Sequence, residues 1–180
     1  MQRIPSLSIE TAPEGSKPLL EAVKKQLGMV PNLFGVFAQS PAVLNAYLSL
    51  SGALGAAKIS AQLREQVALV VASANACDYC ASAHTLLGKG AGVAADELAA
   101  NLAGQSSDAK VQAALDFASA IVNSRGHVAD ADLAAVRAAG YGDDEVVELV
   151  AVTMVNILTN YFNHVAATVV DFPLVSTAKA

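Results

Sequence analysis

The sequence predicts an all-α fold, and three observations favour this class. Alanine is abundant, residues typical of helix ends recur at helix-like intervals, and no pair of alternating strands with a hairpin turn appears. The 180 residues suffice for one domain with a substantial core. We therefore expect a single helical domain over residues 1–180, with its core at about 15–170.

The N-terminal part of the chain predicts two helices joined by a turn. Ser16 is expected to cap a helix that Gly28 ends, and residues 29–34 are expected to form a turn into a short apolar segment. Ser40 is followed by proline, a combination typical of a helix start. We expect the helix that begins there to end at about Leu54.

Two further helices are expected in the middle of the sequence. Ser60 is placed to cap a helix in which residues 67–76 are apolar on nearly every side, so this helix should be buried all round. Residues 77–84 are expected to begin the next helix, which ends in the glycine-containing stretch 88–92.

The second half of the chain predicts four more helices. A short one is expected at 96–102, and Asp108 begins another whose apolar residues recur with a helical period. A further short helix is expected at 130–139. The acidic residues 143–145 begin the last, long helix, because negative charge is favoured at the positive N-terminal end of a helix.

The composition predicts a homo-oligomer that does not bind nucleic acid. Hydrophobic residues make up 54% and charged residues only 15%, so more apolar surface is expected than one subunit of this size can bury. The net charge is −5 and no basic run appears, which argues against a nucleic-acid partner.

Two stretches without charged residues, 26–57 and 149–170, resemble membrane spans in composition. Prolines interrupt the first, and the second carries several amide and hydroxyl side chains that are costly in lipid. We therefore expect buried helices and no membrane partner. Residues 1–5 contain no apolar signal core, so we expect a cytoplasmic protein, in which cysteines stay reduced.

Both cysteines of the chain lie in the motif Cys77-Asp78-Tyr79-Cys80. A helix start lowers the pKa of a thiol, and this spacing lets the two sulfurs close a disulfide. His84 follows Cys80 by four residues and so shares its helix face, where it can shuttle a proton. Glu65, on the preceding helix, can orient that imidazole. These four residues predict thiol redox chemistry.

The expected reaction is the reduction of a hydroperoxide. A thiolate attacks the outer peroxide oxygen and becomes a sulfenic acid, which the second thiol converts to a disulfide with release of water. A reduced external dithiol then regenerates the pair. No resident cofactor and no metal are expected.

A shift of 80 residues relates this motif to the second half of the chain. The pairs are Glu65 and Glu145, Cys77 and Ile157, Cys80 and Asn160, and His84 and His164. The apolar residues between the matched positions also correspond. We therefore expect two similar helical halves, of which only the first carries thiols.

Other interpretations of these side chains stay open. The cysteines can be structural, or can bind Zn²⁺ with the histidine and the glutamate. Glu65 can serve only its own helix end, Tyr79 can line the site or pack in the core, and His164 can be a hydrogen-bonded structural histidine.

The pattern of Glu65, Cys77, Cys80 and His84 resembles the alkyl hydroperoxidase D (AhpD-like) branch of the carboxymuconolactone decarboxylase superfamily. Segments 28–41 and 160–173 contain stretches similar to its peroxidase-related members. The resemblance implies an all-helical fold, often with an internal repeat, in trimers or hexamers. It also implies a hydroperoxide substrate and a dithiol reductant such as a thioredoxin-like or lipoyl protein.

The resemblance assigns a role to each residue of the motif. Cys80 becomes the sulfenic acid, Cys77 is the proton donor and resolving partner, and His84 with Glu65 forms the proton relay. Tyr79 stands where the best-known peroxidase members have histidine. Decarboxylases of the superfamily lack the cysteine pair, so a decarboxylase or other lactone reaction is an alternative, as is a redox-sensing or metal-binding oligomer without catalysis.

Overall fold

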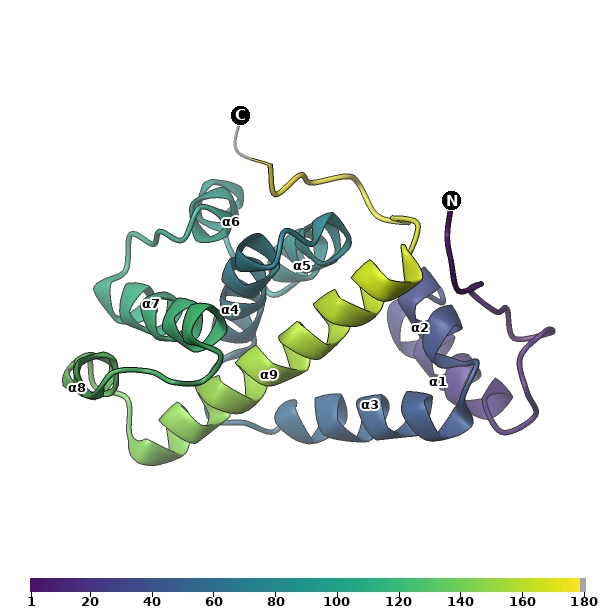
Figure 1. Cartoon of the computed structure of the whole chain (residues 1–180), viewed down its shortest axis with the longest axis horizontal. Coiled ribbons are helices and arrows are strands. Elements are labelled where there is room, and N and C mark those ends of the chain that lie inside the picture. The colour runs from purple at the N-terminus through teal and green to yellow at the C-terminus, as the bar shows by residue number, and fades with distance from the viewer. Residues whose placement is uncertain (179–180) are drawn as a thin grey trace.

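The computed structural model describes residues 1–178, and this part of the chain contains helices but no strands, which confirms the all-α class (Figure 1). The helices are α1 (Lys17–Leu27), α2 (Asn32–Phe37), α3 (Pro41–Leu54), α4 (Ala61–Ala74), α5 (Asp78–Gly90), α6 (Ala95–Leu102), α7 (Ala109–Ser124), α8 (Asp130–Ala138) and α9 (Asp143–Ala166). All of the helices expected from the sequence are present, and residues 29–34 lead into the short helix α2.

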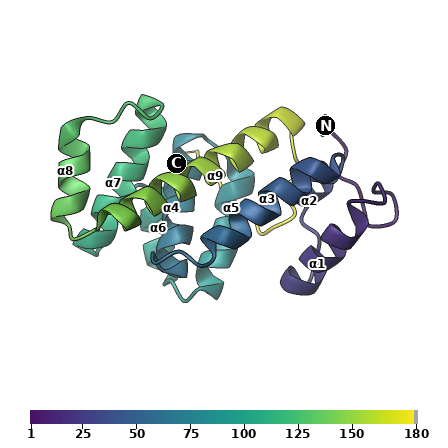
Figure 2. The same ribbon diagram turned by 90° about the horizontal axis from the view of Figure 1, so that it is seen from below.

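Helix α4 lies at the centre of the molecule, where it packs against α5, α6, α7 and α9. Its residues 67–72 are buried, as their apolar character predicts, but the expectation for 73–76 is wrong, because α4 ends at Ala74 and both Ala74 and Ala76 are exposed. The helices α1 and α2 lie at one end of the molecule and α7 and α8 at the other, and α9 spans the distance between them (Figures 1 and 2). Helix α9 therefore contacts both ends of the fold.

Two apolar clusters form the core. One joins α4 to α7, α8 and α9 through residues such as Val67, Leu115 and Leu149. The other joins the N-terminal helices to α5 and contains Cys77 and Cys80. Its aromatic rings pack edge to face or tilted, with centroids 4.8 to 6.4 Å apart; they belong to Phe34, Phe37, Tyr47 and Phe162. The two thiols therefore lie inside a well-packed apolar cluster.

Most of the expected N-caps form, and one does not. The side chains of Ser40, Ser60 and Asp108 accept hydrogen bonds from backbone N–H groups in the first turns of α3, α4 and α7. The expectation for Ser16 is wrong, because its backbone is already helical and its side chain makes no cap bond. The buried Ser16 hydroxyl instead donates to the carbonyl of Ala38 at 2.8 Å. Ser16 thus links α1 to the end of α2.

The segments related by the shift of 80 residues differ in their helix boundaries. Between α4 and α5 the chain breaks at Ala76, whose φ of 53° lies in the left-handed region. The matching residues lie inside the uninterrupted helix α9. The two segments therefore correspond in sequence but not in the arrangement of their helices.

Helix α9 packs directly on the break between α4 and α5. Asn75 Nδ2 donates to Asn160 Oδ1 at 2.9 Å, and His164 Nε2 donates to the Asn75 carbonyl at 2.8 Å. The residues that match Cys80 and His84 after the shift thus hold the start of the cysteine segment in place.

By length and composition alone, α9 is apolar enough to cross a membrane. Within the described residues it nevertheless packs on α4, α7 and α3. It also buries several polar side chains within the fold, namely Asn156, Thr159, Asn160 and Asn163.

The chain segments outside the helices pack on α2 and α5. The C-terminal segment passes over α5, where Thr177 N and Oγ1 each donate to Asp78 Oδ1 at 2.7 Å (Figure 1). The N-terminal segment crosses α2 at Gly35, where an added Cβ would lie 2.8 Å from the carbonyl oxygen of Leu7. Only glycine fits at this crossing.

Candidate active site

The two cysteines lie at the start of α5 with free thiols. Cys77 is the residue before the first helical turn, in extended conformation, and Cys80 lies within that turn. Both side chains are buried, with 2% of their surface exposed. The backbone break at Ala76 turns the chain so that a helix begins immediately after Cys77. The structure thus places the thiol pair at a helix N-terminus, where a thiolate is favoured.

Glu65 and His84 meet across the interface between α4 and α5. His84 Nδ1 donates to Glu65 Oε2 at 2.7 Å, and the two side chains are 20% and 21% exposed. The bond fixes the orientation of the imidazole and leaves its Nε2 for proton exchange. The structure therefore brings together the carboxylate and the imidazole that sequence spacing grouped with the thiols.

The electrostatic surroundings distinguish the two thiols. A hydrogen bond from the thiol of Cys77 lowers the pKa of Cys80, and burial opposes this effect. The positive charge of His84 and the polar side chains of Thr159 and Asn160 lower the pKa of Cys80 further. The same hydrogen bond to Cys80, together with burial, raises the pKa of Cys77. These effects favour the thiolate at Cys80 and the protonated thiol at Cys77.

His84 carries a proton more readily than a free histidine. Burial alone would lower the pKa of His84, but the charge and the hydrogen bond of Glu65, with the negative charge of Cys80, together raise it. These effects favour the protonated imidazole, which is hydrogen-bonded to Glu65 and interacts with the charge of Cys80. Such a group can deliver its proton to a leaving alkoxide.

Helix α9 supplies site residues whose contact with the thiol was not foreseen from the sequence. Asn163 Nδ2 donates to Cys80 Sγ at 3.3 Å, and Thr159 Oγ1 lies 3.8 Å from the same sulfur. Asn160, next to Thr159, is fully buried. The one available signal was the shift of 80 residues, which matches Asn160 to Cys80. These polar groups surround Cys80 on the side of α9.

Two tyrosines border the thiol cluster. The Tyr79 hydroxyl accepts a hydrogen bond from Leu33 N at 3.1 Å, and its ring packs edge to face on Phe172 at 5.5 Å. Tyr79 therefore joins α5 to α2 and to the C-terminal segment. Burial, followed by the negative charge of Cys80, raises the pKa of Tyr47 to about 12, so the Tyr47 hydroxyl stays protonated on the α3 side of Cys80.

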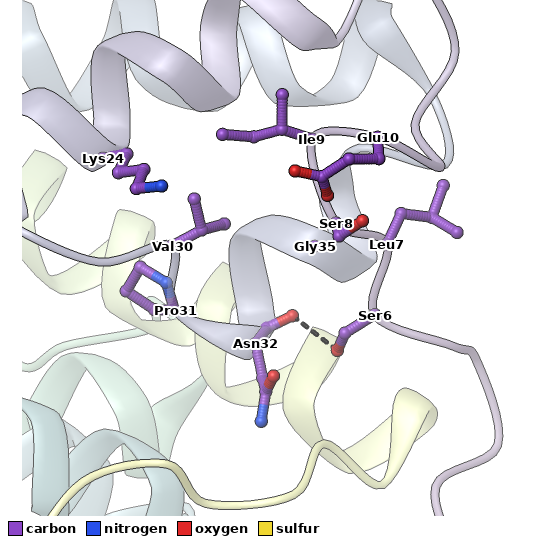
Figure 3. A pocket seen from close by; sticks show the side chains of 10 residues that line it. All are labelled: Ser6, Leu7, Ser8, Ile9, Glu10, Lys24, Val30, Pro31, Asn32 and Gly35. Carbon is purple, nitrogen blue, oxygen red and sulfur yellow. Dashed lines mark hydrogen bonds between the residues drawn. The ribbon is translucent and has the colours of Figure 1, made fainter.

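Three surface depressions lie away from the thiols. Figure 3 shows one of about 310 Å³, where Lys24 of α1 faces Glu10 of the N-terminal segment. The other two border α6 and the chain around it. None of the three is lined by a cysteine. His84 and Glu65 are the partly exposed members of the site. Among residues 1–178, no three histidine, cysteine or acidic side chains converge as a metal site.

An all-helical protein with a buried Cys-x-x-Cys pair beside a Glu–His pair has the architecture of an AhpD-like protein. Residues 41–121, which include both cysteines, Glu65 and His84, match the carboxymuconolactone decarboxylase family. The match covers residues 41–121 and agrees with the resemblance seen in the sequence. No curated protein matches the chain in sequence.

Solved structures with this fold cover almost the whole chain. A peroxidase-related protein of Silicibacter sp. TM1040 is 25% identical, with a TM-score of 0.81 over 92% of this chain and 91% of its own. A protein of Ralstonia eutropha JMP134, described as an alkylhydroperoxidase AhpD core, is 24% identical, with a TM-score of 0.83 over 94% and 92%. The debrominase Bmp8, solved with 2,3,4-tribromopyrrole, is 22% identical, with a TM-score of 0.81 over 93% and 91%.

Proposed function

We propose that the protein is a thiol-dependent peroxidase that reduces hydroperoxides through Cys80 and Cys77. The observation that carries this proposal is the buried pair of free thiols at the start of α5, next to a His84–Glu65 hydrogen bond of 2.7 Å. A nucleophile, a resolving thiol and a proton donor are what a two-cysteine peroxidase requires.

In the first step, the Cys80 thiolate attacks the outer oxygen of a hydroperoxide. The S–O bond forms as the O–O bond breaks, so the sulfur loses two electrons and becomes a sulfenic acid. The leaving alkoxide takes the proton of His84 and departs as an alcohol. Glu65 stabilises the protonated imidazole before this transfer and orients it throughout.

In the second step, Cys77 resolves the sulfenic acid. The sulfur of Cys77 attacks Cys80, the disulfide forms, and the hydroxyl group leaves as water with the proton from Cys77. An external dithiol, such as a thioredoxin-like or lipoyl protein, then donates two electrons and two protons. The cycle needs no resident cofactor, and a cytoplasmic location would supply such reductants.

The proposal is tested by adding peroxide to the reduced protein. One equivalent should remove both thiols per subunit and leave a Cys77–Cys80 disulfide, measured by thiol titration and mass spectrometry. A panel of dithiol donors then measures steady-state peroxide consumption. Thiols that survive the peroxide would contradict the proposal, and a disulfide that forms without turnover by any donor would favour a redox sensor.

A second candidate function is reductive debromination, which the likeness to Bmp8 suggests. The same thiol pair can deliver two electrons to a carbon–bromine bond: the disulfide forms, bromide leaves, one thiol proton ends in the new C–H bond and the other is released. Bromide release from a bromopyrrole by the reduced protein measures this activity. A decarboxylase or lactone reaction, by contrast, should persist after both thiols are alkylated.

We also propose that copies of the chain assemble through α9 and α3, as trimers or hexamers. Five apolar side chains of α9, spaced by three, four or seven residues, lie on one helix face and are more than a third exposed; they are Val147, Val150, Met154, Tyr161 and Val165. Val43 and Leu50, seven residues apart on α3, are exposed in the same way. Stripes with this spacing suit packing against helices of a second copy.

We expect the protein to have a multimeric mass in solution, and Met154→Lys to reduce that mass by placing a charge in the middle of the stripe. Light scattering after size-exclusion chromatography measures the mass, with circular dichroism to confirm that helix content is kept. Leu174→Lys is the matched control, because Leu174 is 71% exposed but lies outside the stripe. A monomeric unmodified protein would contradict the assembly.

A further inference from the structure

Besides Thr153 Oγ1, two buried polar atoms of α9 have no hydrogen-bond partner among the described residues. They are Asn160 Nδ2, an amide donor, and Asn163 Oδ1, an amide acceptor. Asn160 is fully buried and Asn163 is 5% exposed. Buried polar groups are almost always paired, so two unpaired atoms on one helix face call for an explanation. Both belong to side chains that lie beside Cys80.

The other polar atom of each amide already has a hydrogen-bond partner. Asn160 Oδ1 accepts from Asn75 Nδ2 at 2.9 Å, and this bond turns Asn160 Nδ2 to the opposite side of the amide. Asn163 Nδ2 donates to Cys80 Sγ at 3.3 Å, which leaves Asn163 Oδ1 as the free atom of that amide. Because the two residues are three positions apart, they lie on one face of α9.

We propose that Asn160 and Asn163 hold the oxygen atom that Cys80 takes from a hydroperoxide. Asn160 Nδ2 donates to this oxygen, and Asn163 Oδ1 accepts the O–H of the resulting sulfenic acid. The inference rests on the proposed peroxidase function and deepens it. It assigns two catalytic residues to a helix that contributes no thiol.

The chemical match lies in the groups that a sulfenic acid presents. The S–O–H unit has one proton to donate and oxygen lone pairs that accept, and the two free amide atoms supply one acceptor and one donor. The outer O–H of a hydroperoxide presents the same groups, so these amides can orient the substrate before attack. Asn163 Nδ2, meanwhile, stabilises the thiolate.

A second consequence concerns further oxidation. A sulfenic acid that loses its proton is a better nucleophile toward a second peroxide, which converts it to the irreversible sulfinic acid. An acceptor at Asn163 Oδ1 keeps the proton on the oxygen. We therefore expect the pair to favour resolution by Cys77 over sulfinic acid formation.

The test uses a Cys77→Ala background, in which a sulfenic acid at Cys80 cannot resolve. Asn160→Leu and Asn163→Leu should each slow oxidation of Cys80 by hydrogen peroxide about tenfold, the effect of one lost transition-state hydrogen bond. Asn163→Leu should also increase the sulfinic fraction in mass spectra. Rates are compared well above the titration midpoint of each thiol, measured by thiolate absorbance, so that altered pKa values do not contribute.

Two controls separate this role from a structural one. Asn156→Leu changes another buried asparagine of α9, which bonds only the Val152 carbonyl one turn away and should leave the rate unchanged. Asn75→Ala removes the partner of Asn160 Oδ1 without touching Cys80. Should leucine not be accommodated, alanine at 160 and 163 makes the same comparison.

The outcomes also separate this inference from the proposed function. If the Cys77→Ala protein forms no sulfenic acid with peroxide, the peroxidase proposal itself fails. If it forms one, and folded variants at 160 and 163 match its rate and its sulfinic fraction, only the role of the two asparagines is overturned.

Discussion

Cys80→Ser should abolish hydroperoxide reduction, whereas Cys77→Ser should halt the cycle after a single oxidation. A serine hydroxyl stays protonated near neutral pH and cannot replace the thiolate that the surroundings of Cys80 stabilise. Without Cys77, the sulfenic acid at Cys80 has no resolving partner. Dimedone should then label Cys80 in the Cys77→Ser protein after one equivalent of peroxide, as mass spectrometry would show.

The chain provides its own control for this experiment. Cys77 and Cys80 are its only cysteines, so each variant retains one thiol and every loss is assigned without ambiguity. In the Cys80→Ser protein, the hydrogen bond between Cys77 and the Cys80 thiolate is lost, but burial still raises the pKa of the Cys77 thiol. We therefore expect Cys77 to react slowly in this variant. Full peroxide turnover by Cys80→Ser would contradict the assignment of the nucleophile.

His84→Asn should lower kcat/KM for a hydroperoxide by about 10²- to 10⁴-fold, the usual contribution of a positioned proton donor. Asparagine keeps a polar side chain at the position but supplies neither the proton for the leaving alkoxide nor the positive charge beside Cys80. Stopped-flow measurement of peroxide reduction gives the comparison. His127→Asn, in an exposed loop, is the matched control for the loss of a histidine.

Glu65→Gln should shift the pH dependence of this reaction. Activity requires both the Cys80 thiolate and protonated His84, so it rises as the pH passes the lowered pKa of Cys80 and falls as the pH rises through the pKa of His84. The charge of Glu65 raises that pKa, and glutamine keeps an acceptor for Nδ1 but removes the charge. The fall should therefore move to lower pH in Glu65→Gln. An alkaline limb at the same pH as in the unmodified protein would show that Glu65 does not act through His84.

Local sequence signals predicted the helices because the energetic determinants of their ends are local. Ser40, Ser60 and Asp108 cap the helices that they precede, and the hydrogen bonds involved span two or three residues. Ser16 has the same kind of sequence context, yet its hydroxyl reaches Ala38, 22 residues away. A cap prediction fails when a tertiary contact offers the same side chain a better partner.

The residues of the candidate site also fall into two groups: those that spacing along the chain predicts, and those that only the tertiary fold brings together. The thiols and His84 lie within one helix start, and Glu65 lies on the helix before it, so spacing along the chain was sufficient to group them. Asn163 and Thr159 contact Cys80 across 83 and 79 residues. Such contacts depend on how α9 packs over the break at Ala76, and helical periodicity contains no information on that packing.

Because Asn163 and Thr159 are so far from Cys80 along the chain, the surroundings that make Cys80 reactive should form late in folding. During synthesis the ribosome releases both cysteines well before α9 exists, and domains fold from the N-terminal side as they emerge. A nascent chain thus carries a Cys80 without its Asn163 and Thr159 contacts. Oxidant sensitivity increases when the last helix docks, and the alkylation rate of Cys80 during refolding would report that event.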